Sequence, residues 1–341
     1  MLRTPRLKAT LNPGALRVLF LAPYAPDAPD YLEKEYDKDG GYPEYHYKLY
    51  LALEALGFQV WSTSKPYAVH FARGNADYVF SLMNRIPILN AEIFVSAYCE
   101  FIRIPYLGAR PNIRALAEDK YLTKLAAKSI DIPVAPGIPL DSRRAAPRKA
   151  PFDGPYFVKD RFGAASEGIT EMNVCRDWYT VRERARELIA VGQDLIVERF
   201  CPGVDVTVPV LGGTKPIVLG FVQPISDKPN SILTEDLKLF DHLGYKMIDV
   251  GTMEKAFLHD VELLWQALGP IDYFRADYRV DFDTGRRWLL EINICCYLGK
   301  SGAICLAGAQ HGLSQKEILN HVIAFSLERQ KLLRQHCEWI L

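Results

Sequence analysis

The sequence has no net charge, because 41 Lys and Arg residues balance 41 Asp and Glu residues. Proteins that bind a nucleic-acid backbone usually carry a clustered basic excess. The balance therefore argues against nucleic acid as the principal ligand. The sequence also has no run of about 18 apolar residues, the length at which a membrane-spanning helix becomes a candidate. No membrane partner is expected.

Cysteine is sparse, and its spacing is uninformative. The seven cysteines are scattered and odd in number, and no two of them form a C-x-x-C motif. This spacing favours neither a disulfide framework nor a zinc knuckle. A reducing cytoplasm is therefore the expected compartment.

The remaining composition is typical of a folded, globular protein. Hydrophobic residues make up 49% of the 341 residues, and charged residues make up 24%. These values are far from the low hydrophobicity and high net charge of disordered chains. The length indicates about two domains, with room for three small lobes.

The first part of the chain alternates strand and helix patterns, which predicts a parallel sheet flanked by helices. The expected strands are 16–22, 58–62 and 77–82, with a helix over 45–57. Another helix is expected over 113–129.

The pattern changes twice further along the chain. Residues 154–200 are typical of a small mixed lobe, and the last third contains a helix near 253–268, a hairpin at 273–293 and a helix from Ser314. We therefore expect three parts, which are an N-terminal α/β domain (1–112), a central subdomain (113–200) and a C-terminal subdomain (201–341).

The segment FRADYRVDFDTGRRWLLEIN, residues 274–293, carries the most chemical information. A three-residue loop at 283–285 would close it, because Gly285 can adopt the left-handed conformation. This register opposes Val280 to Trp288, Tyr278 to Leu290 and Ala276 to Ile292. Period-two alternation then places the charged residues on the other face of the hairpin.

In this register Asp277 lies directly opposite Glu291, a like-charge pair that destabilises a hairpin unless a cation lies between the two carboxylates. Two carboxylates and the amide oxygen of Asn293 suit Mg²⁺, which usually also binds oxygens of the substrate's phosphates. Arg275, opposite Asn293, would bind phosphate oxygens. The alternative is an ordinary solvated face of charged residues.

These segments resemble the ATP-grasp superfamily, and in particular its D-alanine:D-alanine ligase-like branch, from about Arg17 to Gly308. The resemblance implies an α/β and α+β chain with three lobes. These lobes are an N-terminal parallel α/β lobe, a small central lid lobe and a C-terminal lobe with an antiparallel sheet. It further implies ATP and about two Mg²⁺ ions, for which Mn²⁺ can substitute.

The resemblance also implies a nucleotide site. Lys120 in EDKYLTK and Lys159 in YFVKD match lysines that contact phosphate, and the lid that would cover the phosphates contains Ala165, Ser166 and Gly168. The segment LIVERFCPGVDVTV matches the part of the family that binds adenine and ribose. Glu198 would bond to the adenine side, and the backbone of Phe200 and Cys201 would face the edge of the base. Asp205 would bind the ribose hydroxyls.

Catalytic roles follow from the same resemblance. Asp277, Glu291 and Asn293 would hold magnesium, Arg275 would stabilise transition-state charge, and Lys238 would reach the terminal phosphate.

The chain departs from the family on the substrate side. Ala165 replaces the family's serine, and no EHxVS-like segment follows the first strand. In the family, the residues after the hairpin bind the acceptor substrate. Their nearest counterparts here are Gly299, Lys300, Ser301 and Gly302. Of these, Ser301 is expected to have a catalytic role. Glu44 is a further candidate substrate contact. These departures argue against D-alanine as the substrate.

The resemblance implies an ATP-dependent carboxylate-amine ligase that forms an amide or dipeptide through an acyl phosphate and releases ADP and phosphate. The expected partners are small carboxylate and amine substrates of an amino-acid-like kind, in specialised metabolism. Two alternatives stay open: a regulatory nucleotide-binding protein without turnover, and a ligase with a carrier-linked or non-amino-acid acceptor. A homodimer also stays open.

Overall fold

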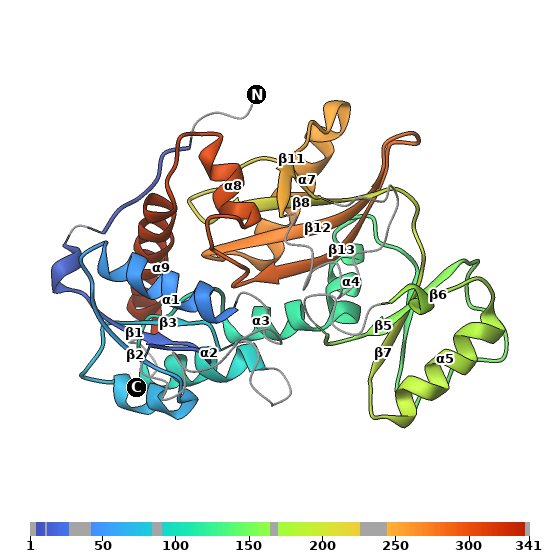
Figure 1. Ribbon diagram of the computed structural model, residues 1–341, viewed down its shortest axis with the longest axis horizontal. Coiled ribbons are helices and arrows are strands. Elements are labelled where there is room, and N and C mark those ends of the chain that lie inside the picture. Colours follow the sequence, from blue (N-terminus) through green and yellow to red (C-terminus); the bar gives the residue numbers. More distant parts are fainter. Residues whose placement is uncertain are drawn as a thin grey trace.

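The computed structural model describes residues 5–10, 12–26, 42–83, 91–163, 170–225 and 244–337. Three sheets organise the chain (Figure 1). A parallel sheet in the order β2-β1-β3 comes first, followed by a four-stranded sheet in the order β4-β7-β5-β6. The third sheet has the order β11-β10-β8-β12-β13, with β9 paired to β8. No helix in the described part of the chain is long and apolar enough to cross a membrane.

The N-terminal lobe confirms the expected parallel sheet. Its strands are parallel, and β1 lies between the other two. The elements of this lobe are η1 Pro13–Ala15, β1 Arg17–Leu21, α1 Tyr42–Glu54, β2 Gln59–Thr63, η2 Pro66–Ala72, β3 Tyr78–Ser81 and α2 Ala91–Ile102.

The helix expected over 113–129 is wrong as a single element. The chain forms α3 (Pro111–Glu118) and α4 (Lys120–Ser129) with a break at Asp119. The Asp119 carboxylate accepts hydrogen bonds from the backbone amides of Tyr121 at 2.9 Å and Leu122 at 3.1 Å. A side-chain cap of this kind begins a new helix, so α4 starts at a lysine next to the lid lobe.

The central lobe has its own small core. Trp178 packs edge-on against Tyr156 with ring centroids 5.1 Å apart, beside buried Val158, Val181 and Val197. The elements of this lobe are β4 Gly137–Leu140, β5 Tyr156–Asp160, η3 Glu171–Asn173, β6 Val174–Cys175, α5 Trp178–Ala190 and β7 Leu195–Arg199.

The C-terminal lobe is built on the sheet that contains the expected hairpin. Phe257 of α7 packs against Tyr278 of β12, with centroids 5.1 Å apart. The elements of this lobe are β8 Val204–Leu211, β9 Ile217–Val218, β10 Val222–Pro224, β11 Tyr245–Met247, η4 Gly251–Met253, α7 Glu254–Leu268, β12 Tyr273–Asp281, β13 Arg286–Ile294, α8 Ala303–Ala309 and α9 Gln315–Cys337.

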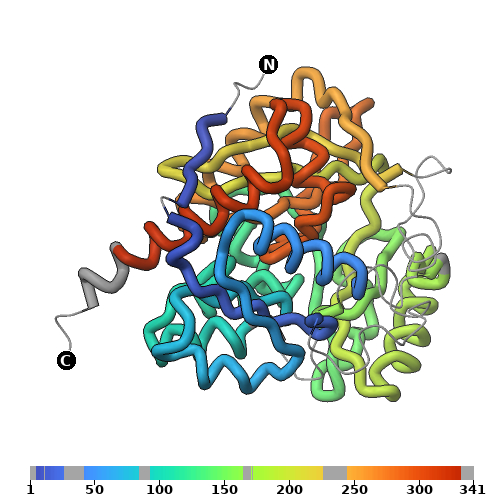
Figure 2. The backbone as a smooth tube through the Cα atoms, turned by 60° about the vertical axis from the view of Figure 1, so that its left-hand side comes forward, coloured from blue at the N-terminus to red at the C-terminus, as the bar shows by residue number. Residues whose placement is uncertain are grey.

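The last helix, α9, begins with a reciprocal cap and returns to the N-terminal lobe. Ser314 and Glu317 exchange backbone and side-chain hydrogen bonds at its start, as in a capping box. The N-terminal segment then runs beside the helix (Figure 2), where the Thr10 amide donates to Asn320 at 3.0 Å and the Lys8 amide donates to His321 at 2.8 Å.

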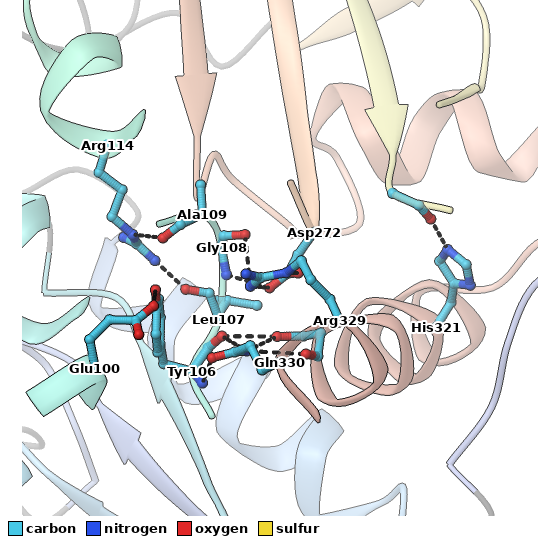
Figure 3. A network of polar contacts seen from close by, with 12 residues as sticks. Glu100, Tyr106, Leu107, Gly108, Ala109, Arg114, Asp272, His321, Arg329 and Gln330 are labelled. Carbon is cyan, nitrogen blue, oxygen red and sulfur yellow. Dashed lines mark hydrogen bonds and ion pairs between the residues drawn. The ribbon is translucent and has the colours of Figure 1, made fainter. Parts of the chain in front are cut away.

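A buried polar network joins α9 to both larger lobes (Figure 3). Arg329 donates from Nε to Asp272 at 2.8 Å, and the second oxygen of Asp272 accepts from the Gly108 amide at 2.6 Å. Gly108 has a φ of +107°, and a Cβ there would collide with Arg114 and Cys295. The N-terminal and C-terminal lobes also share one hydrophobic core. The two lobes are therefore packed as one unit.

Candidate active site

The β12–β13 hairpin places the two expected carboxylates opposite each other. Asp277 pairs with Glu291, and Arg275 pairs with Asn293, as the register predicted. Asn293 Nδ2 donates to Asp277 Oδ2 at 2.8 Å and to Glu291 Oε1 at 3.1 Å. Thr207 of β8 donates its hydroxyl to Asp277 Oδ1 at 2.7 Å. An amide nitrogen and a hydroxyl thus hold the two carboxylates in place.

The predicted register is wrong toward the hairpin tip. Tyr278 pairs with Leu289 instead of Leu290, and Val280 pairs with Arg287 instead of Trp288. Strand β12 therefore ends at Asp281, one residue earlier than the expected loop at 283–285 requires, and the loop spans 282–285. The Asp281 carboxylate accepts from the amides of Asp283 and Thr284. An irregularity between Asp277 and Tyr278 absorbs the difference, so the pairing at the carboxylates is the predicted one.

The donor set fits a hard divalent cation. The candidate set is two carboxylates and one amide, Asp277, Glu291 and Asn293. Within the described residues no group of three His, Cys, Asp or Glu side chains could hold a metal ion. The Asn293 amide already bridges both carboxylates. Turning this amide over exchanges nitrogen for oxygen, which would complete the all-oxygen set that Mg²⁺ prefers.

Arg275 lies beside these carboxylates and is largely buried. Its Nε donates to Asp277 Oδ2 at 3.2 Å, and its Nη1 donates to the hydroxyl of Tyr245 at 3.1 Å. The sequence analysis did not identify Tyr245, because this residue comes from β11, 30 residues earlier in the chain.

The lid sheet supplies a buried cluster of opposite charges. Glu198 of β7 forms ion pairs with Lys124 at 2.6 Å and with Lys159 at 2.7 Å. Burial alone raises the pKa of Glu198, but the two ammonium groups outweigh it and hold this pKa at about 2. Lys124 was missed as a site residue, although it lies four residues after Lys120 and so on the same face of α4.

Lys120 is the first residue of α4 and donates its ammonium group to the carbonyl of Gly163, which precedes the lid segment. Burial lowers the pKa of Lys120, and the Glu291 carboxylate is the largest opposing influence. The pKa of Lys159 is raised against the effect of burial, mainly by Glu198 and further by Glu291. Helix α4, which begins at Lys120, packs against strand β13, which carries Glu291. The electrostatic influence of Glu291 on the lysines agrees with this packing.

The connection between β7 and β8 contains the expected base and ribose contacts. The Phe200 amide donates to the Pro155 carbonyl at 2.8 Å, so this amide is already used within the protein. Arg279 donates to the Cys201 carbonyl at 3.3 Å and to Asp205 at 3.0 Å. That the β7–β8 connection binds the base and the ribose stays a prediction. Arg279, which the sequence analysis did not identify, holds the Cys201 carbonyl and the Asp205 carboxylate in place.

The expected acceptor-binding segment, Gly299 to Gly302, forms a tight turn, in which the Gly302 amide donates to the Gly299 carbonyl at 2.9 Å. Lys300 and Ser301 are exposed in this turn.

Glu44 lies on the outer face of α1, with 69% of its side chain exposed, and pairs with Lys48. Its neighbour Tyr45 is buried and accepts a hydrogen bond from the Leu298 amide at 3.0 Å. Tyr45, and not Glu44, thus contacts the segment after the hairpin. The expected contacts Ala165, Ser166, Gly168 and Lys238 lie outside the described residues.

The acid sensitivity of the fold should depend on Glu198. Because its pKa is depressed in the folded protein, its ion pairs stabilise the fold above the ordinary pKa of 4.5, and this stabilisation is lost as the pH falls toward about 2. Glu198→Gln should therefore lower stability at pH 7 and flatten its decline below pH about 5. Denaturant midpoints measured from pH 7 to 3 test this. An equally steep decline in the variant would contradict the assignment, and the exposed Glu187→Gln serves as control.

The three sheets and the charged site between the second and third define a class of protein, the ATP-grasp fold of three lobes. A D-alanine–D-alanine ligase from Bacillus anthracis, solved with ATP, has a TM-score of 0.70 at 14% identity, covering 94% of this chain and 100% of that chain. The D-alanine–D-alanine ligase of Coxiella burnetii also has a TM-score of 0.70, at 15% identity over 95% of this chain and 97% of that chain.

Comparisons of sequence point to the same branch. The D-alanine–D-alanine ligase of Chlorobium limicola is 26% identical over 246 residues, which is 68% of this chain and 65% of that enzyme. The D-alanine–D-alanine ligase of Gloeobacter violaceus is 24% identical over 287 residues, covering 81% of this chain and 91% of that enzyme. No family model matches the chain. The resemblance to the D-alanine–D-alanine ligase-like branch of the ATP-grasp superfamily is confirmed.

Proposed function

We propose that the protein is an ATP-dependent carboxylate-amine ligase that releases ADP and phosphate. One observation carries the proposal. Helix α4, which begins at Lys120 and carries Lys124, packs against strand β13, which carries Glu291, so the cationic lid side lies beside the pair of carboxylates. A site of this composition suits the transfer of a phosphoryl group between two anions, where charge must be neutralised.

The roles of the residues follow from their charges and positions. Lys120, Lys124 and Lys159 bind the phosphates of ATP, and Glu198 keeps two of these lysines in place before the nucleotide arrives. Asp277, Glu291 and Asn293 hold Mg²⁺, about two ions in all, or Mn²⁺ in its place. When bound, the metal withdraws electrons from the terminal phosphoryl group and offsets its charge.

Arg275 is one of the residues that contact the reacting groups. Its guanidinium lies beside the metal carboxylates and is largely shielded from water. A carboxylate substrate attacks the terminal phosphorus of ATP, ADP leaves, and an acyl phosphate forms. An amine then attacks the acyl carbon and displaces phosphate, which gives the amide. Arg275 stabilises the anionic oxygens in both steps, because a fixed cation in a dry site needs no reorganisation.

The substrates that we propose are amino-acid-like and different from two D-alanines, with a dipeptide or an amide of specialised metabolism as the product. Ala165 and the segment ICCYLGKSG after Asn293, which depart from the family's pattern, support this difference. Tyr45 lies beside the expected acceptor loop, where its hydroxyl accepts from the Leu298 amide. Gly299, Lys300, Ser301 and Gly302 are the proposed acceptor contacts. We further propose a cytoplasmic protein with the divisions 1–112, 113–200 and 201–341. The three sheets support three parts, while the first boundary falls inside α3 (Pro111–Glu118).

The test is ADP release from Mg·ATP by the purified protein, supplied with pooled D- and L-amino acids and simple carboxylates. Mass spectrometry of the products identifies any new amide. ADP together with a new amide mass supports the ligase and names its substrates. Tight ATP binding without ADP release from any pool would instead support the regulatory nucleotide-binding protein. A protein that binds no nucleotide would refute both.

A further inference from the structure

The guanidinium of Arg275 is held from two sides. Asp277, two residues along β12, accepts from Nε at 3.2 Å, and Tyr245 accepts from Nη1 at 3.1 Å. The side chains of Arg275 and Asp277 are only 17% and 15% exposed. The tyrosine hydroxyl is thus part of the polar lining next to the metal carboxylates.

Backbone pairing fixes the position of Tyr245. It pairs with Pro224 as β11 runs antiparallel to β10, and β10 pairs with β8 at Thr207. Thr207 is the residue whose hydroxyl binds Asp277. Gly244, just before β11, has a φ of +71°, a conformation that glycine adopts without strain, and its carbonyl accepts from the Ile225 amide at 3.0 Å. The sheet therefore brings β11 to the same carboxylate that Thr207 holds.

The hydroxyl of Tyr245 retains a donor. The Tyr245 oxygen accepts a hydrogen bond from Arg275. Among the described residues, no group accepts a hydrogen bond from the Tyr245 hydroxyl. Burial raises the pKa of Tyr245, and the carboxylates of Asp277 and Glu291 act in the same direction while Arg275 opposes them. The phenol therefore stays protonated at neutral pH and can donate one hydrogen bond.

We propose that Tyr245 is a second hydrogen-bond donor, beside Arg275, to the anion that forms next to Asp277 and Glu291. The proposal rests on the proposed function, in which this anion is the transferred phosphoryl group. A guanidinium and a neutral hydroxyl bind an oxyanion from two directions. The O–H bond of Tyr245 does not break, because the hydroxyl stabilises charge and does not transfer its proton.

Orthophosphate binding to the Mg·ADP complex tests the proposal without knowledge of the substrates. Calorimetry first measures Mg·ADP affinity and then the affinity of the complex for inorganic phosphate. Tyr245→Phe should leave Mg·ADP affinity unchanged and weaken phosphate binding about tenfold or more, because hydrogen bonds to charged groups are worth more than neutral ones. Arg275→Met should weaken phosphate binding further.

A matched control is Tyr106→Phe, which removes another buried tyrosine hydroxyl, one that donates to Glu100 at 2.7 Å. This variant should bind phosphate as the unmodified protein does. The proposal is overturned if Tyr245→Phe binds phosphate normally, if it loses Mg·ADP affinity to the same extent, or if the unmodified complex binds no phosphate. Failure of the unmodified protein to bind Mg·ADP would refute the proposed function itself.

Discussion

Glu291→Gln is expected to abolish ADP-forming turnover while leaving the fold intact. Glutamine keeps the size of the side chain and can still accept from Asn293, which now donates to Glu291 at 3.1 Å. The substitution removes one of two carboxylates from the metal set, and charge stabilisation by a bound metal is worth several kcal/mol. Turnover should therefore fall by at least about 10³-fold. The measurement is ADP release together with the Mg²⁺ concentration that supports nucleotide binding.

The control variant is Glu187→Gln, which removes an exposed carboxylate on α5, 64% exposed at its side chain. It should retain full turnover and the ordinary Mg²⁺ dependence. Thermal unfolding of both variants separates a lost metal ligand from a lost fold. Undiminished ADP formation by Glu291→Gln would refute the metal assignment.

Arg329→Met is expected to cause the largest loss of stability. Asp272 and Arg329 are 0% and 4% exposed, and the pair joins α9 to the segment around Gly108 (Figure 3). Removing one partner of a buried ion pair leaves the other charge unpaired away from water. Such changes cost about 3–5 kcal/mol. Urea unfolding monitored by circular dichroism measures the difference.

Two further variants define the cause. Adding Asp272→Asn to Arg329→Met removes the unpaired charge, and the double variant should recover part of the lost stability. Arg186→Met breaks an exposed ion pair with Glu183 and should cost no more than about 1 kcal/mol. Equal losses in Arg329→Met and Arg186→Met would show that the buried network contributes little.

The hairpin shows most clearly what sequence patterns can and cannot predict about strand pairing. Alternation along one strand and a glycine at the turn were sufficient to oppose Asp277 to Glu291, which the structure confirms. The same reasoning failed at the tip, where the Asp281 carboxylate caps the turn and lengthens the loop by one residue. Alternation reports which face a residue occupies, but it does not report how a turn satisfies its amides.

Helix periodicity showed a similar limit at Asp119. The apolar spacing runs through residues 113–129 without interruption, so it predicted one helix. The break appears because the Asp119 carboxylate accepts from two amides of α4 and also from Arg161 Nε at 2.8 Å. Arg161 belongs to the lid lobe, and its contact with Asp119 depends on how two lobes pack.

The sequence by itself determined the order of the lobes, the parallel first sheet and the two opposed carboxylates, because these depend on local periodicity and on pairing between neighbouring strands. Only the tertiary structure decided that Glu198 holds Lys124 and Lys159, that Tyr245 binds Arg275 and that Arg329 binds Asp272. These contacts join residues that lie 30 or more positions apart. They form only when elements that are distant in the sequence pack together and exclude water between charged groups, a condition that no local pattern of residues records.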